Sequence, residues 1–100
     1  MPEIFIYLGL VFKFYSDDHY PIHIHVIKGE YESIYDLVIV NNMLVELKKR
    51  KKRGVEHLPP ADAQKAEVFI REKWDIIVEK WSDYFVRNIP VKVTKITKKI

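Results

Sequence analysis

Apolar and polar residues follow a strand-like pattern through the first half of the chain. Residues 3–15 (EIFIYLGLVFKFY) are dense in the β-branched and aromatic types that favour strands. Gly9, near the middle of this segment, suggests a bulge or a bend between two strand segments. Turn-forming residues then lead to Pro21, which biases the residue before it to extended backbone. The pattern predicts strand in residues 3–15 and again in residues 22–27.

Two short turn signals divide the next stretch of sequence. The tripeptide at 28–30 (KGE) looks like a tight hairpin connection, and the pair of asparagines at 41–42 predicts a second turn. Residues 31–40 between them, and residues 43–48 after them, keep the apolar content of strands. We therefore expect residues 1–48 to form an antiparallel β-meander of about four strands.

The period of the apolar positions changes after the two prolines at 59–60. Apolar residues now recur at steps of three and four along one face, which predicts an amphipathic helix over residues 61–87. Asn88 and Pro90 mark its end. We expect the two tryptophans of the stripe to anchor the core rather than to stack on bases. The stripe consists of Ala63, Ala66, Ile70, Trp74, Ile77, Trp81 and Phe85.

The remaining segments complete the expected organisation. Residues 49–60 are predicted to form a basic, proline-containing loop. Residues 88–100 are predicted to form a tail or an additional edge strand, whose lysines would discourage edge-to-edge association. The expected fold class is α+β, with one domain over residues 1–100 in which the long helix packs on one face of the sheet.

Composition narrows the chemistry that the chain can support. The 100 residues are 48% hydrophobic, enough for one modest core. The absence of cysteine excludes disulfides and thiolate metal sites, so any metal would be held by histidine and carboxylate. We expect neither a signal peptide nor a transmembrane helix, because no basic N-terminal region precedes an apolar stretch and the apolar stretches are short. We expect a cytoplasmic protein with no membrane partner. No cofactor is expected, although a divalent metal stays possible.

The positive charge is concentrated in one run. The net charge is +3, and six of the 17 basic residues are consecutive, whereas the rest of the chain carries more acidic than basic residues. Such a run usually lies in a solvated loop, and it also attracts phosphate. The candidate phosphate-binding residues are Lys48, Lys49, Arg50, Lys51, Lys52 and Arg53.

Three of the four histidines lie within seven residues, in segment 17–26 (DDHYPIHIHV). Because side chains alternate across a strand, His23 and His25 should share one face of the sheet. Glu32 and Asp36, on the following strand, and Asp18, in the preceding turn, are the carboxylates expected to be able to orient the imidazoles.

The opening MPEIF, Gly9 within an aromatic strand and the segment DDHYPIHIHV together resemble a small bacterial family, domain of unknown function 4160. The resemblance covers roughly residues 1–86, and the late tryptophan of the helix belongs to it. The usual pattern has a second proline at Ile22, and it lacks the basic run and the lysine-rich tail. Its most specific part is the motif D-H-x-P-x-H-x-H, matched here by Asp18, His19, Pro21, His23 and His25.

This resemblance implies a partner more clearly than an activity, because the family has no settled biochemical function. Members are often encoded beside, or fused to, a second small domain, domain of unknown function 2442. Some of these pairs resemble type II toxin and antitoxin modules. The resemblance therefore implies a small cognate protein as partner and makes a toxin role an expectation, with the acting residues unassigned.

One function compatible with these residues is metal-independent cleavage of RNA. The imidazoles of His19, His23 and His25 would exchange the protons, since histidine titrates near neutral pH. The basic run would hold the phosphate backbone and stabilise developing charge. Unpaired bases could stack on Tyr15, Tyr20, Tyr31 or Tyr35.

Two other functions remain open. His23 and His25 could converge on a divalent ion, although no spacing identifies the third ligand. The candidates for it are His19, Asp17, Asp18, Glu30, Glu32 and His57. Alternatively, the histidines are structural, and an edge strand or the helix binds the cognate protein, or a second copy in a homodimer, without chemistry.

Overall fold

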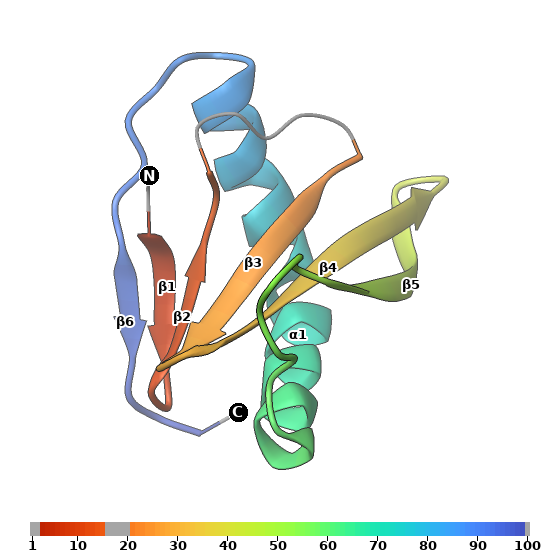
Figure 1. Ribbon diagram of the computed structural model, residues 1–100. Helices are drawn as coiled ribbons and strands as arrows, with labels where there is room; N and C mark the ends of the chain where they lie inside the picture. Colours follow the sequence, from red (N-terminus) through yellow and green to blue (C-terminus); the bar gives the residue numbers. More distant parts are fainter. Residues whose placement is uncertain (1–2, 16–20, 100) are drawn as a thin grey trace.

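The computed structural model describes residues 3–15 and 21–99. Within this part of the chain, six strands form one mixed sheet and a single helix covers one of its faces, which confirms the α+β class (Figure 1). The order across the sheet is β5-β4-β3-β2-β1-β6. The elements are β1 (Glu3–Tyr7), β2 (Leu10–Lys13), β3 (His23–Lys28), β4 (Tyr31–Val40), β5 (Met43–Lys51), α1 (Pro60–Phe85) and β6 (Thr94–Ile96).

Tight turns join β1 to β2, β3 to β4 and β4 to β5 within the expected antiparallel meander from β1 to β5. Leu8 and Gly9 connect β1 to β2 with φ angles of 49° and 80°, and Asn41 and Asn42 connect β4 to β5 with φ angles of 52° and 62°. Two central residues with positive φ are the type I′ geometry that suits the twist of a hairpin, and Gly and Asn adopt it most easily. Gly9 therefore marks a reversal between two strands, and the turn expected at the asparagines is confirmed.

The basic run forms a strand over most of its length, which corrects the boundary predicted at residue 48. β5 continues to Lys51 along β4, with Asp36 opposite Lys48 and Tyr35 opposite Lys49. Arg50 donates two hydrogen bonds of 2.8 Å to the Asp36 carboxylate. Alternation sends neighbouring cations to opposite faces of the strand, which lowers the repulsion that favoured a loop. The connection to α1 is correspondingly shorter than the predicted loop at 49–60.

The expected C-terminal edge strand is present as β6. It pairs with β1 in parallel, with Phe5 opposite Thr94 and Tyr7 opposite Ile96. A parallel pair requires a crossover, which the long helix supplies by carrying the chain from one edge of the sheet to the other. The sheet is therefore mixed, since the meander from β1 to β5 is antiparallel and the added edge strand is parallel to β1.

The helix α1 packs across the sheet and ends two residues before the predicted boundary at 87. Phe69 lies at the centre of the interface, with its ring centroid 5.1 Å from Phe5 and 4.7 Å from each of Tyr7 and Phe12. Trp81 is 2% exposed and anchors the core as expected, whereas Trp74 is only partly buried against it. Aromatic packing of this kind supplies much of the apolar burial in a domain this small.

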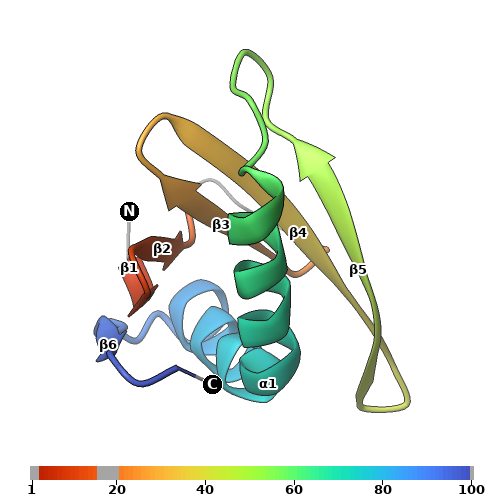
Figure 2. The ribbon, with the colours of Figure 1, turned by 90° about the horizontal axis from the view of Figure 1, so that it is seen from below.

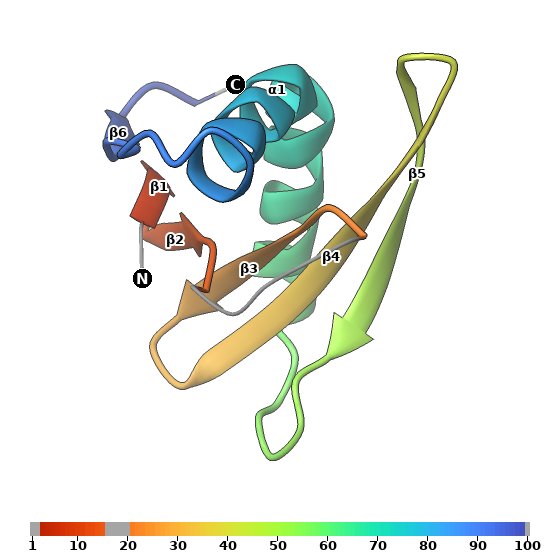
Figure 3. The ribbon, with the colours of Figure 1, turned by 90° about the horizontal axis from the view of Figure 1, so that it is seen from above.

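Seen along the sheet, the β4–β5 hairpin extends past the helix and away from the rest of the molecule (Figure 2, Figure 3). Its tip exposes apolar side chains, with Val40, Met43 and Val45 each at least half exposed. In the part of the chain that is described, no helix has the length and apolar character required to cross a bilayer.

Candidate functional site

We call the sheet face turned away from α1 the outer face. Residues directly opposite each other in neighbouring strands project to the same face. Lys13 lies opposite His25, and His23 lies opposite Asp36, which lies opposite Lys48 in turn. Ile24 and Val26 point into the core under the helix. His23 and His25 alternate with them along β3, so they and the residues opposite them project to the outer face. The register thus gathers histidines, carboxylates and cations from four strands on one surface.

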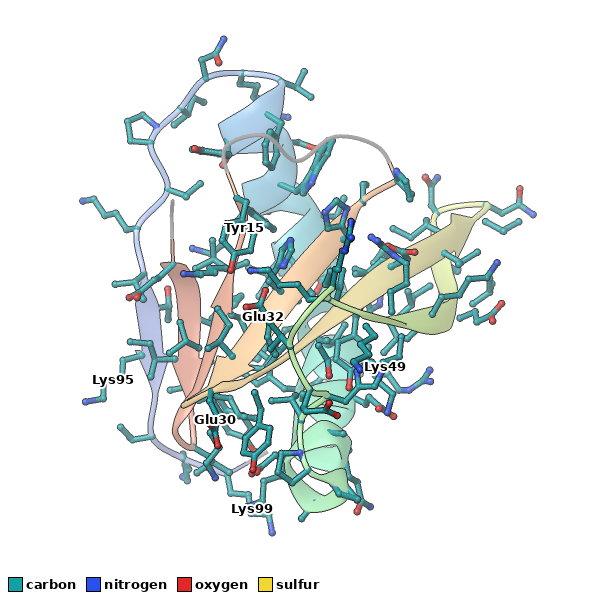
Figure 4. All side chains as sticks on the ribbon, in the orientation of Figure 1. Tyr15, Glu30, Glu32, Lys49, Lys95 and Lys99 are labelled. Atoms are coloured by element: carbon teal, nitrogen blue, oxygen red, sulfur yellow. The ribbon has the colours of Figure 1, made fainter. Side chains whose placement is uncertain are left out.

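Glu32 is the centre of a hydrogen-bond network on this face. Its carboxylate accepts hydrogen bonds from the Tyr15 hydroxyl at 3.1 and 3.2 Å, from His25 Nδ1 at 2.9 Å and from Lys52 Nζ at 3.3 Å. Tyr15 and Glu32 meet on the side of the sheet opposite the helix (Figure 4). The Glu32 side chain is only 8% exposed, so three donors compensate a nearly buried negative charge.

The hydrogen bonds fix the proton positions of both imidazoles. His25 Nδ1 faces an ionised carboxylate and His23 Nδ1 lies 2.8 Å from the carbonyl oxygen of Pro21, and neither oxygen can donate. Both Nδ1 atoms must therefore carry hydrogen. In the neutral rings the lone pair lies on Nε2, the atom that can accept a proton or bind a metal.

The two imidazoles lie close enough to act as a pair. Their ring centroids are 5.4 Å apart, and His23 and His25 are 7% and 5% exposed. The rings of Tyr15 and His25 pack nearly perpendicular to each other, with 4.1 Å between centroids. The Nε2 atom of His25 is itself buried, so a ligand can reach it only if neighbouring groups move.

Burial and charge set the protonation of the donors around Glu32. Burial raises the pKa of the Tyr15 hydroxyl, and the negative charge of Glu32 adds to this, while Lys52 opposes it. The hydrogen bond to Tyr15 raises the pKa of Lys52, and the Glu32 carboxylate acts in the same direction. At neutral pH the network therefore holds a neutral phenol and an ammonium.

Alternation divides the predicted phosphate-binding residues between the two faces. Lys48 and Arg50 project to the outer face, and Lys52, just beyond β5, joins the Glu32 network there. Lys49 and Lys51 project to the face that α1 covers in part, and Arg53 is exposed in the following turn. The run therefore does not act as one patch.

Four predicted residues of the segment before β3 lie outside the described residues: Asp17, Asp18, His19 and Tyr20. Among the described residues, no group of three or more histidines, cysteines or carboxylates is arranged to hold a metal ion. A metal at His23 and His25 thus stays a prediction.

The expectation that Tyr35 offers a base-stacking surface is wrong. Tyr35 is 1% exposed, and its hydroxyl donates to Glu67 of α1 at 3.0 Å. The Tyr15 ring is also engaged, since Lys13 and Lys52 place their ammonium groups 5.1 and 4.7 Å from its centroid. Of the described tyrosines that were predicted to stack on bases, Tyr31 is therefore the candidate that remains.

Sequence reasoning assigned Glu32 an orienting role but missed the convergence of Tyr15 and Lys52 on it. Residues 15, 32 and 52 are distant in sequence, and only the strand register brings them together. Glu32 is a polar residue within a largely apolar strand, but Lys52 is one of six consecutive basic residues and Tyr15 one of six tyrosines, so no local sequence signal marks the convergence.

The fold and the site define a class of protein: a small α+β domain in which a helix covers one face of a mixed sheet and a histidine–carboxylate network occupies the other. The chain matches the family described as Domain of unknown function (DUF4160) over residues 9–82, and it belongs to that family. Neither curated proteins nor solved structures gave a match.

Proposed function

We propose that the outer face binds RNA and cleaves it by proton transfer at His23 and His25. The observation that carries this proposal is the His25–Glu32 hydrogen bond of 2.9 Å, formed beside an ammonium group within 3.3 Å of the same carboxylate. A histidine oriented by a carboxylate is an effective proton acceptor, and a nearby ammonium can stabilise a phosphate in the transition state.

In this mechanism RNA binding opens the site around His25 Nε2, which is buried in the structure, and this atom takes the proton from the 2′-hydroxyl of a ribose. The hydroxyl oxygen then attacks the adjacent phosphorus, and Glu32 stabilises the protonated imidazole. His23, in its protonated form, gives a proton to the departing 5′-oxygen, and Lys52 neutralises charge on the phosphorane. The products are a 2′,3′-cyclic phosphate and a 5′-hydroxyl, and no metal is needed.

Lys48 and Arg50 extend the same face away from the histidines and are proposed to hold neighbouring phosphates. His19 is proposed as a further proton-transfer group and Asp18 as an orienting group, on the strength of the sequence motif alone. If the resemblance to toxin and antitoxin pairs applies, this activity is that of the toxin, and a cognate protein of the domain of unknown function 2442 family restrains it.

The test is degradation of single-stranded RNA in the presence of a chelator, with analysis of the product ends. We expect cyclic phosphate ends from the wild-type chain and loss of activity in His25→Asn and His23→Asn. The asparagine amide can replace the Nδ1–H donor, so the local hydrogen bond is retained while the proton acceptor is removed. The matched control is His57→Asn, because His57 contacts Ser33 instead of the network.

Three results would refute the proposal. Intact RNA across single-stranded and structured substrates would exclude cleavage, and equal activity in His25→Asn and His57→Asn would exclude the histidine mechanism. Activity that depends on added zinc, with one equivalent of metal lost in His25→Asn, would replace it with the metal function.

The exposed apolar tip of the β4–β5 hairpin favours a second candidate function, that of an interaction module. Met43 and Val45 are 61% and 56% exposed at the end of an edge strand, where they can bind another protein or a second copy. Under this alternative the wild-type chain forms a dimer in sedimentation equilibrium and the double variant Met43→Ser with Val45→Ser is a monomer. A monomeric wild-type chain would exclude the homodimer.

A further inference from the structure

A pocket of about 300 Å³ lies between the first turns of α1, the end of β1 and the C-terminal tail. It shares no residue with the outer-face network, so nothing in the proposed RNA chemistry accounts for it. Figure 4 labels Lys99 beside the first turns of the helix. The residues that line the pocket are Tyr7, Ala61, Gln64, Lys65, Val68 and Lys99.

The inner wall of this pocket is apolar and fixed in position. Tyr7 stacks on Phe69 with 4.7 Å between ring centroids and an interplanar angle of 28°. Ala61 and Val68 are seven positions apart on α1 and so lie on one face of the helix, two turns from each other. Val68 is 45% exposed although it borders the pocket. An apolar ligand group that covered Val68 would gain the free energy of removing this surface from water.

The rim of the pocket is cationic. Lys65 and Lys99 supply two ammonium groups and Gln64 supplies an amide, and none of the described residues that line the pocket is acidic. The one acidic residue of the first helical turn, Asp62, is held by Lys28 at 3.0 Å. The N-terminus of α1 adds to the positive potential, because Pro59 provides no side-chain cap for the free N–H groups.

We propose that this pocket binds a small organic anion, in which one phosphate or carboxylate group is joined to a compact apolar body. Such sites are typically concave and apolar, with a few polar groups that fix the orientation of the ligand. The anionic group lies between Lys65 and Lys99, and the apolar body rests on Tyr7 and Val68. An inorganic anion cannot make the apolar contact with Tyr7 and Val68. A neutral aromatic compound cannot make the charged contact with the two lysines.

The experiment follows backbone amide shifts of the full chain during titration with four probes: phenyl phosphate, benzoate, inorganic phosphate and phenol. We expect phenyl phosphate, benzoate or both to produce saturable shifts at Gln64, Lys65 and Val68. Inorganic phosphate and phenol should bind at least tenfold more weakly. Binding of phenyl phosphate alone identifies a phosphate ligand, and binding of benzoate alone identifies a carboxylate.

A matched pair of variants separates this pocket from general attraction to a basic protein. The variant Lys65→Gln with Lys99→Gln should weaken binding of the anionic aromatic probe by about tenfold or more. The control Lys73→Gln with Lys95→Gln removes the same charge elsewhere, since Lys95 lies on β6 away from the pocket (Figure 4). Binding in the control should stay within twofold of the wild type.

Equal losses in the two variants, or phenol binding as tightly as the anions, would overturn the proposal, as would the absence of saturable shifts at the pocket. The result is independent of the RNA function. Neither Lys65 nor Lys99 contacts the outer face, so both double variants should retain any RNA cleavage of the wild-type chain.

Discussion

Glu32 makes the clearest connection between sequence and site at the scale of single residues. Alternation along β3 is enough to predict that His23 and His25 share a face, because a strand has a period of two. Alternation does not reveal which carboxylate of β4 contacts the two histidines. A shift of one residue in the β3–β4 register would turn every side chain of β4 to the other face of the sheet. The observed pairing of Ile27 with Glu32 sets that register. Tyr15 and Lys52 could not be assigned for the same reason.

Replacing Glu32 by glutamine should lower the free energy of unfolding by about 2–3 kcal/mol. The amide turns donor hydrogens toward a site where a tyrosine, a histidine and a lysine already donate. Urea unfolding at neutral pH measures the change. Glu30→Gln is the control, because Glu30 is an exposed neighbour and its replacement should stay within about 0.5 kcal/mol. Equal effects of the two substitutions would show that the network does not stabilise the fold.

At the scale of elements, hydrophobic patterning predicted most of the strands and the helix, and it failed where charge dominated the sequence. The basic run carries no apolar periodicity, so a loop was expected. The structure continues β5 through it because β4 offers Asp36 to Arg50. Such a tertiary contact is not visible in a local window of sequence. The parallel pairing of β6 is equally non-local, since it joins residues at the two ends of the chain.

The β1–β2 connection gives a prediction at this scale. Gly9 has a φ of 80°, and a Cβ built there meets no atom within 4 Å, so a substitution would cost only backbone strain. Gly9→Ala should therefore destabilise the fold by about 1–2 kcal/mol, the usual cost of the left-handed region for a residue with a side chain. Thermal and urea unfolding provide the measurement. A stability equal to that of the wild type would mean that the turn does not adopt this conformation in solution.

At the scale of the whole molecule, one sheet separates two environments. The inner face and α1 form an apolar core, tied at its margins by hydrogen bonds such as Tyr35 to Glu67 and Lys28 to Asp62. The outer face holds titratable groups at low exposure. Composition and periodicity could predict this division between a helix-covered face and a polar face. They could not predict that His23, His25 and Glu32 on the polar face would be nearly buried.

This arrangement predicts a loss of stability at alkaline pH. The pKa values of Tyr15 and Tyr35 are raised by burial and by a neighbouring carboxylate, and that of Lys52 is raised by its contacts with Tyr15 and Glu32. Above about pH 10 the folded chain therefore holds protons that the unfolded chain has released, and the free energy of unfolding falls as pH rises. Below that pH the contribution is fully present.

Urea unfolding between pH 7 and pH 11 measures this dependence. Tyr35→Phe should reduce the fall in the free energy of unfolding at alkaline pH. Phenylalanine has no hydroxyl proton to lose, so the contribution of Tyr35 to that fall disappears. A stability that stayed constant or rose above pH 10 would contradict the assignment of these groups as protonated in the folded state.

The most direct test of the outer face as the RNA surface compares two double variants of β5. Lys48→Gln with Arg50→Gln removes two outer-face cations, and Lys49→Gln with Lys51→Gln removes two from the same strand on the other face. The measurement is the slope of the logarithm of the RNA association constant against the logarithm of salt concentration. For single-stranded RNA the outer-face variant should reduce the magnitude of this slope by about 1.4, since each phosphate contact contributes about 0.7. The other variant should leave it unchanged, and equal slopes in the two variants would contradict the account.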